Sequence, residues 1–201
     1  MTGILNYGMG NILSIKNALT QIEEESIYVG HKDDFSLIDR LIIPGVGSFS
    51  DAMNNIIERD LYDSIMMLIN QKKPLLGICL GMQLLCQIGE EEGYTKGFSY
   101  FEGNVVKFDL KNSQRIPHIG WNSLKIKRDH PILSGVKTEA DFYFLHSFHF
   151  NENYNVVAMS EYGYEFPAII AKDNVIGIQF HPEKSQKQGL KILRNFIDIE
   201  C

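Results

Sequence analysis

The chain has 201 residues, the size of one ordinary domain, so we expect a single domain over residues 1–201. Its residues are 44% hydrophobic and 22% charged, which is typical of a globular protein and excludes a disordered or fibrous chain. The formal net charge of -6 argues against sequence-independent binding to nucleic acid, since such binding depends on clustered lysine and arginine.

Residues 1–6 lack the basic region and apolar stretch of an export signal. No window has the roughly 18 consecutive apolar residues that a membrane span requires, so we expect a cytoplasmic protein. Cys79, Cys86 and Cys201 form no Cys-x-x-Cys pair, which disfavours a disulfide framework or a zinc site. We therefore expect three free thiols, no metal ion and no cofactor.

The first half of the chain alternates short apolar runs with amphipathic stretches, the pattern of β-α-β units. The runs 41–43 and 75–78 are continuously apolar, as expected of strands that are buried on both faces of a parallel sheet. We therefore predict an α/β fold with a mostly parallel central sheet flanked by helices. The predicted strands are 2–6, 26–30, 41–44 and 74–78, and the predicted helices are 11–23, 50–59, 60–70 and 80–88.

After Gly93 the pattern changes to strand-like runs separated by turn residues. We predict a β-rich second half with strands at 103–109, 142–150, 155–160, 167–172 and 175–180. Residues 186–198 place leucine, isoleucine and phenylalanine along one stripe, which predicts an amphipathic helix at the C-terminus.

The strongest chemical signal is the segment Gly77-Ile78-Cys79-Leu80-Gly81, at the junction of a predicted strand and a predicted helix. It has the pattern of a nucleophile elbow with cysteine in place of serine, in which flanking glycines leave room for a sharp, strained turn. The N–H groups at the beginning of a helix favour a thiolate there and can receive an oxyanion. The alternative is a small cysteine buried in the core.

A thiolate nucleophile needs a base, and the chain has six histidines. His181 is the best candidate, because it ends the predicted strand 175–180 and the carboxyl ends of parallel strands share one edge with Cys79. Glu183, two residues further on, could orient the ring as the third member of a triad. The other histidines have plainer explanations. His31 and His130 lie in polar loops, His118 follows a proline in a predicted turn, and His146 and His149 lie on a predicted strand where packing or a surface role explains them.

The segment Pro44-Gly45-Val46-Gly47 also follows a predicted strand. Two glycines around one residue let the backbone turn its N–H groups outward, so that Val46 and Gly47 could donate to an oxyanion beside Leu80. A plain turn is the alternative. The third glycine of a dinucleotide-binding loop is missing.

These motifs together resemble the class I glutamine amidotransferases, through residues 77–83 and 180–183. Segments 6–11, 44–49, 117–122 and 181–186 are similar to the glutaminase subunits of imidazole glycerol phosphate synthases, in histidine biosynthesis. The resemblance implies the class I amidotransferase fold and hydrolysis of glutamine to glutamate and ammonia. Cys79 would attack the side-chain amide, His181, oriented by Glu183, would protonate the departing ammonia, and water would cleave the thioester.

The resemblance also implies a glutamine pocket built from residues that look unremarkable in the sequence. Gln83 and Glu91 would hold the head groups of glutamine, and the backbone of His146, Ser147 and Phe148 would line the pocket. A surface glutamine and a solvated acidic loop are the plain alternatives for Gln83 and Glu91.

Free ammonia would be protonated and lost in water, and 201 residues leave no room for an acceptor domain, so a glutaminase of this size needs a partner. The resemblance implies a heterodimer with a (β/α)8-barrel cyclase subunit, whose channel takes the ammonia. Asn11, Trp121 and Lys184 would lie at the interface. An exposed lysine and a buried tryptophan are the plain alternatives.

Two positions depart from the family pattern, because Phe148 stands where tyrosine is usual and Asn6 where aspartate is common. They leave open a paralogous glutaminase that supplies a sugar amidotransferase in surface polysaccharide biosynthesis. A catalytically idle regulatory subunit is a second alternative, disfavoured by the intact triad. A cysteine hydrolase acting on peptides is a third, disfavoured by Gln83 and the 44–47 turn.

Overall fold

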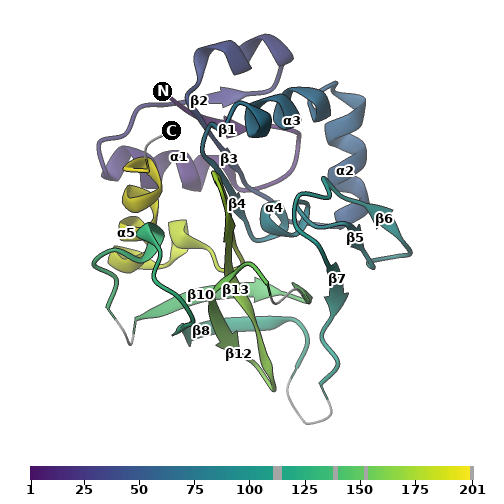
Figure 1. The fold of residues 1–201 in the computed structure, drawn as a ribbon, viewed down its shortest axis with the longest axis vertical. Helices are drawn as coiled ribbons and strands as arrows, with labels where there is room; N and C mark the ends of the chain where they lie inside the picture. The colour runs from purple at the N-terminus through teal and green to yellow at the C-terminus, as the bar shows by residue number, and fades with distance from the viewer. Residues whose placement is uncertain (111–114, 138–139, 152–153, 200–201) are drawn as a thin grey trace.

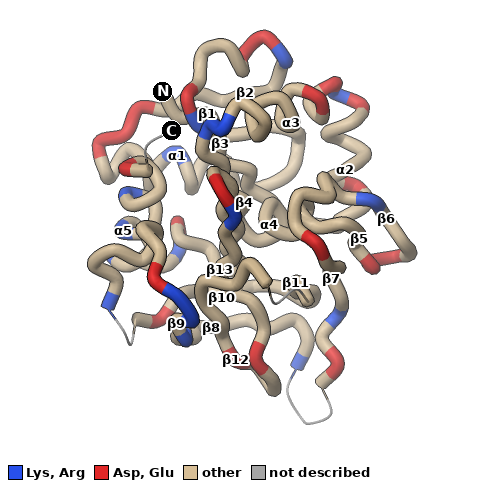
Figure 2. The backbone as a smooth tube through the Cα atoms, viewed as in Figure 1, with Lys and Arg blue, Asp and Glu red and all other residues tan. Residues whose placement is uncertain are grey.

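The computed structural model describes residues 1–110, 115–137, 140–151 and 154–199 (Figure 1). Cys201, one of the expected thiols, lies outside these ranges, whereas Cys79 and Cys86 are both free thiols. Within the described residues, no helix has the length and apolar character needed to cross a bilayer. Acidic and basic residues are interspersed in the view of Figure 2.

The central sheet has eight strands, five of them parallel. Across the sheet the order is β2 (Ser26–Val29), β1 (Thr2–Leu5), β3 (Arg40–Ile43), β4 (Leu75–Ile78), β14 (Val175–Ile178), β13 (Glu165–Lys172), β12 (Val156–Glu161) and β9 (Lys125–Ile126). The pairs from β2 through to β14 are parallel, and those from β14 to β9 are antiparallel. The predicted parallel sheet with a β-rich second half is therefore confirmed.

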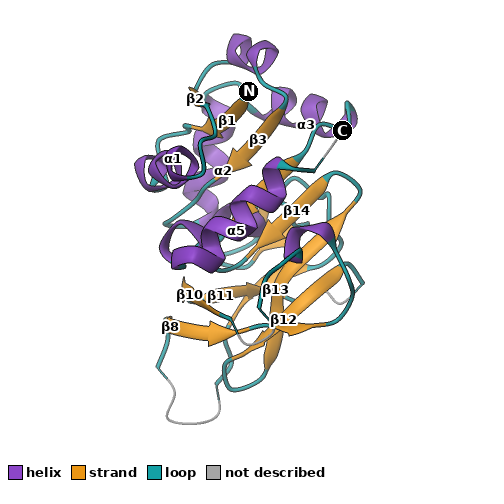
Figure 3. Cartoon of the chain, turned by 90° about the vertical axis from the view of Figure 1, so that its left-hand side faces the viewer, coloured by secondary structure: helices purple, strands orange, loops and turns teal. Residues whose placement is uncertain are grey.

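Helices cover both faces of this sheet. Neighbouring residues of a strand point to opposite faces, so each strand contributes side chains to both helical layers. Leu5, Leu41 and Leu75 pack with α2 (Phe49–Glu58) and α3 (Tyr62–Asn70). Ile4, Ile42 and Leu76 pack with α1 (Ile12–Gln21) and α5 (Gln186–Ile197), which lie side by side in Figure 3. This alternation explains why the strands read as unbroken apolar runs.

The helix predicted over 80–88 is too long. The helix α4 spans only Leu80–Gln83, and short 3-10 helices occur elsewhere at η1 (Lys32–Leu37), η2 (Pro131–Leu133) and η3 (Pro182–Lys184). The backbone N–H of Phe98 donates to the carbonyl of Leu84, and that of Tyr100 to the carbonyl of Leu85. Segment 97–101 thus takes carbonyls that a longer helix would use for itself.

The predicted strand 142–150 is two strands in different sheets. β10 (Asp141–His146) pairs with β8 (His118–Ser123), so the prediction of a turn at His118 is wrong. β11 (Phe148–Phe150) pairs with β7 (Asn104–Lys107), in a sheet that continues through β5 (Ile88–Gly89) to β6 (Thr95–Lys96). The chain therefore changes sheets at Ser147.

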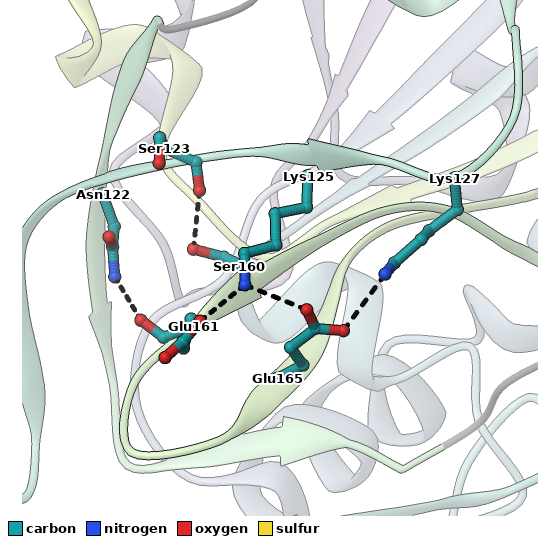
Figure 4. Close-up of polar contacts among 7 residues, drawn as sticks. All are labelled: Asn122, Ser123, Lys125, Lys127, Ser160, Glu161 and Glu165. Carbon is teal, nitrogen blue, oxygen red and sulfur yellow. Dashed lines mark hydrogen bonds and ion pairs between the residues drawn. The ribbon is translucent and has the colours of Figure 1, made fainter.

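Charged side chains mark the antiparallel end of the central sheet (Figure 4). Lys125 on β9 contacts Glu161 at 2.6 Å and Glu165 at 3.0 Å, and Lys127 contacts Glu165 at 3.1 Å. All four side chains are substantially exposed, so each pair contributes little to stability. Lysines on an edge strand instead discourage pairing with another chain.

Candidate active site

Cys79 occupies a strained turn between β4 and α4. Its φ is +53°, a left-handed conformation that is costly for a residue other than glycine and is typical of functional sites. A Cβ on Gly81 would lie 1.9 Å from the carbonyl oxygen of Ile43, and one on Gly77 would lie 2.5 Å from the carbonyl oxygen of Gly81. The two flanking glycines are therefore a steric requirement of this turn.

His181 reaches the same edge because β14 is the parallel neighbour of β4. Ile78 pairs with Ile178, and the N–H of Cys79 donates to the carbonyl of Ile178 at 2.8 Å. Three residues later, the N–H of His181 donates to the carbonyl of Tyr143 at 2.8 Å. The ends of these two strands hold Cys79 and His181 at one edge of the sheet.

Glu183 pairs with the imidazole of His181. Nδ1 of His181 lies 2.9 Å from Oε1 of Glu183, and the two side chains are only 3% and 2% exposed. Burial lowers the pKa of His181, but the charge of Cys79 and the carboxylate of Glu183 together raise it to about 10. Nε2 is buried without a hydrogen-bond partner among the described residues. That nitrogen is therefore available for proton exchange.

Two further groups surround the sulfur of Cys79. The thiol donates to the carbonyl of Leu145 at 3.7 Å, and Nε2 of Gln179 donates to the sulfur at 3.6 Å. Gln179 was not a candidate in the sequence. Its only signal there is its position two residues before His181, which places both side chains on the same side of an extended segment.

The 44–47 turn lies against the elbow. A Cβ on Gly45 would approach the Cβ of Leu80 to 2.6 Å and the nitrogen of Gly81 to 2.9 Å. Gly47 has a φ of +106°, which glycine adopts without strain, and the side chain of Val46 is exposed. The structure therefore brings Gly45 of this turn against Leu80 and Gly81, and the role of Val46 and Gly47 as oxyanion donors stays a prediction.

The side chains of Gln83 and His146 meet at the backbone carbonyl of Phe148. Nε2 of Gln83 donates to the carbonyl of Phe148 at 2.9 Å, and Nδ1 of His146 contacts the same oxygen at 2.8 Å. Burial lowers the pKa of His146 to about 3, so its ring is neutral. Together with the contact between Leu145 and Cys79, these bonds place the segment beside the elbow.

Glu91 lies at the beginning of α2. Its Oε2 accepts a hydrogen bond from the N–H of Phe49, the first residue of that helix, at 2.9 Å. A carboxylate there satisfies an unpaired N–H and complements the helix dipole. Glu91 is half-buried, so the plain alternative of a solvated acidic loop does not fit it.

Trp121 and Lys184 gather around Tyr143, next to His181. The rings of Trp121 and Tyr143 meet edge-on with centroids 5.8 Å apart, and Nζ of Lys184 lies 5.6 Å from the Tyr143 centroid. The ring of Tyr143 is 6.4 Å from that of His181. Trp121 is 48% exposed, so it is not the buried tryptophan of the plain alternative.

Asn11, the remaining interface candidate, is exposed and caps α1, accepting a hydrogen bond from the N–H of Ser14. The helix that it begins contacts η3, which contains Lys184. In the part of the chain that the structure describes, no three histidine, cysteine, aspartate or glutamate side chains are grouped as metal ligands.

The comparisons with known proteins agree with this geometry. The family model of the class-I glutamine amidotransferases matches residues 4–199. The imidazole glycerol phosphate synthase subunit HisH of Methanocaldococcus jannaschii is 44% identical over 200 residues, which cover 99% of this chain and 100% of that one. The subunit of the same name from Caldanaerobacter subterraneus subsp. tengcongensis is 46% identical over 204 residues, which cover 100% of both chains.

Solved structures show the same fold at low identity. A glutamine amidotransferase crystal structure has a TM-score of 0.77 at 19% identity, and the match covers 98% of this chain and 97% of that one. The PurLQS structure from Thermotoga maritima has a TM-score of 0.76 at 20% identity, with the same coverage.

Proposed function

Because the chain belongs to the class-I glutamine amidotransferase family, we propose that it is the glutaminase subunit of an imidazole glycerol phosphate synthase, a single catalytic domain that supplies ammonia in histidine biosynthesis. The observation that supports this most is the meeting of Cys79 with the buried His181–Glu183 pair at the ends of β4 and β14. Both relatives described above are named for this synthase, which favours it over a sugar amidotransferase as the acceptor.

The first half of the reaction forms a thioester. The thiolate of Cys79 attacks the side-chain amide carbon of glutamine, and the oxygen of the tetrahedral intermediate takes up negative charge. Backbone N–H groups of Val46, Gly47 and Leu80 are the donors that we propose for it. His181 carries the proton, because its raised pKa of about 10 keeps the imidazolium form at neutral pH. That proton passes from Nε2 to the departing ammonia.

The second half releases glutamate. Once ammonia has left, His181 is neutral and can accept a proton from a water molecule that attacks the thioester. Collapse of the second tetrahedral intermediate returns the sulfur as a thiolate. Glu183 holds Nδ1 throughout, so the ring presents Nε2 in both halves.

The glutamine pocket that we propose lies over the elbow. The side chains of Gln83 and His146 both bond to the carbonyl of Phe148. We propose that Gln83 and the backbone of His146, Ser147 and Phe148 hold the polar head of the substrate there. Glu91 would contribute its carboxylate to the α-ammonium group from the beginning of α2.

The partner that we propose is a (β/α)8-barrel cyclase in a cytoplasmic heterodimer. Trp121 offers an exposed aromatic ring, Lys184 a cation and Asn11 an exposed polar cap. Leu13 and Ile119, also exposed at 60% and 58%, add apolar surface on α1 and β8. Exposed aromatic and apolar side chains close to a site are typical of an interface. Across this interface, the ammonia released beside His181 would pass to the cyclase subunit.

The test is glutamate release from glutamine by the chain in complex with the cyclase subunit. We expect Cys79→Ala to abolish turnover while the complex still forms, and the buried thiol variant Cys86→Ala to retain it. Glutamine turnover that survives in Cys79→Ala would refute the assignment. Peptide cleavage without glutaminase activity would favour the cysteine hydrolase alternative.

A further inference from the structure

Gln179 is a buried glutamine with no role in the reaction as described above. It directly follows β14, is 0% exposed, and its backbone N–H donates to the carbonyl of Ala168 at 2.9 Å. Its side-chain amide lies between two residues of the proposed site, the nucleophile Cys79 and the pocket residue Gln83. Since the amide is buried, these two contacts determine its orientation.

The two ends of the amide have opposite hydrogen-bonding roles. Nε2 of Gln179 donates toward the sulfur of Cys79 at 3.6 Å, and its Oε1 accepts from Nε2 of Gln83 at 3.1 Å. A glutamine amide donates only through nitrogen and accepts only through oxygen. Rotating the amide of Gln179 by half a turn would set its oxygen against the sulfur of the proposed thiolate and its nitrogen against the donor of Gln83. Both changes are unfavourable.

Gln83 is itself fixed, because its Nε2 also donates to the carbonyl of Phe148 at 2.9 Å. A continuous set of hydrogen bonds thus runs from the backbone of the proposed glutamine pocket through Gln83 and Gln179 to the sulfur of Cys79. All three side chains are at least nine-tenths buried, so water does not readily replace any of these donors.

We propose that Gln179 is a donor that stabilises and orients the Cys79 thiolate, and that Gln83 is a positioning residue that acts through it. This inference rests on the proposed function and extends it. The amide of Gln179 then acts on the sulfur as a donor separate from His181, whose Nε2 has no hydrogen-bond partner among the described residues and supplies the proton in the proposed reaction. Because Gln83 also belongs to the pocket, binding of glutamine is linked to the environment of the nucleophile.

The test uses two substitutions of Gln179. Gln179→Met keeps the length of the side chain and removes the donor, and Gln179→Glu keeps its shape and places an acceptor where the donor was. The first readout is the pH at which half of Cys79 reacts with iodoacetamide in the isolated chain, followed on the Cys79 peptide. The second is kcat and KM for glutamine in the complex with the cyclase subunit.

We expect the half-reaction pH to rise by about one unit in Gln179→Met and further in Gln179→Glu, with kcat about tenfold to a hundredfold lower, since a hydrogen bond to a charged group is a strong one. Gln83→Leu should shift the half-reaction pH in the same direction. It should add little in the Gln179→Met background, because both substitutions act on the same donor to the sulfur, Nε2 of Gln179.

Asn195→Asp is the matched control. Asn195 is a buried amide whose Nδ2 donates to the carbonyls of Ile132 and Ser134. It should lower thermal stability without moving the half-reaction pH. The inference is overturned if folded Gln179→Met and Gln179→Glu keep the half-reaction pH and kcat of the wild type. If the wild-type complex releases no glutamate while the half-reaction pH still shifts, the proposed function fails and the donor assignment to Gln179 stands.

Discussion

Nδ1 of His181 lies 2.9 Å from Oε1 of Glu183, and this contact decides which nitrogen of the ring performs chemistry. Burial opposes a charged imidazole, yet the charge of Cys79 and the carboxylate of Glu183 raise the pKa of His181 to about 10. A carboxylate in this position favours the imidazolium and holds a proton on Nδ1 in the neutral ring. His181 therefore depends on Glu183 for both its protonation and its orientation.

Replacing Glu183 with glutamine should retain the fold and remove most of the activity. The amide has the shape of the carboxylate but no charge, and its NH2 group can force the wrong tautomer on His181. We expect kcat for glutamine to fall on the order of 10²- to 10⁴-fold. The exposed Glu165, which pairs with two lysines at the sheet edge (Figure 4), provides the control, because Glu165→Gln should leave kcat unchanged. Wild-type kcat in Glu183→Gln would contradict the triad.

Gly45→Ala should separate the 44–47 turn from the elbow. The added methyl group would lie 2.6 Å from the Cβ of Leu80 and 2.9 Å from the hydroxyl of Tyr7, and that hydroxyl already donates to the carbonyl of Pro44 at 2.8 Å. The turn must shift, so we expect kcat to fall by about 10²-fold, the effect of losing an oxyanion donor.

Gly30→Ala is the matched control for this substitution, since its methyl group would meet the carbonyl oxygen of Asn6 at an ordinary 3.5 Å. Steady-state kinetics with the cyclase subunit present measures both variants. Equal kcat values for the two would show that the turn does not contribute to catalysis.

The buried pair His118 and His146 predicts a loss of stability in acid. Their facing nitrogens lie 3.1 Å apart, and burial lowers the pKa of His118 from 6.5 to about 4. Between these two values the unfolded chain binds a proton that the folded chain does not, so the free energy of unfolding falls as the pH falls. His118→Asn, which keeps a donor near the position of Nδ1, should reduce this slope by about one proton.

Urea unfolding at a series of pH values from 7 to 4 measures the slope. His31→Asn is the control, because His31 has a side chain that is 64% exposed, and its substitution should leave the acid slope unchanged. An undiminished slope in His118→Asn would show that His118 does not titrate on unfolding.

The parts of the site that the sequence predicts are those encoded by short segments. The elbow at Cys79 is one, because its two glycines and its nucleophile lie within five consecutive residues. The meeting with His181 is another, because parallel strands that are read as buried must end at a common edge. Glu183 follows from being two residues away from His181.

The parts that the sequence does not predict depend on contacts between distant segments. The helix over 80–88 ends at Gln83 because residues 97–101 bind its later carbonyls. The strand over 142–150 divides at Ser147 because β8 and β7 pair with its two halves. The contact between Gln179 and Cys79 joins residues 100 positions apart, and no local pattern specifies it.

Trp121→Ala should weaken binding of the cyclase subunit and leave the isolated chain folded. Trp121 is 48% exposed and its ring meets that of Tyr143 edge-on, so its loss creates no internal cavity. A tryptophan at the centre of an interface contributes about 2 kcal/mol or more, and we therefore expect Kd to rise by about thirtyfold. Titration calorimetry measures Kd. Tyr94→Ala is the control, because Tyr94 is also an exposed aromatic residue, at 83%. An unchanged Kd in Trp121→Ala would place the interface elsewhere.

Cys79 and Cys86 should differ in reactivity, although both are buried free thiols seven residues apart. Burial raises the pKa of Cys86 to about 12, which leaves almost no thiolate at pH 8, whereas Cys79 faces the imidazole of His181. Iodoacetamide should therefore label Cys79 faster than Cys86 by on the order of a hundredfold or more in the folded chain. In denaturant the two rates should converge, because the difference comes from the folded environment. Peptide mapping reads the two cysteines separately, and equal labelling in the folded chain would mean that the elbow does not activate its thiol.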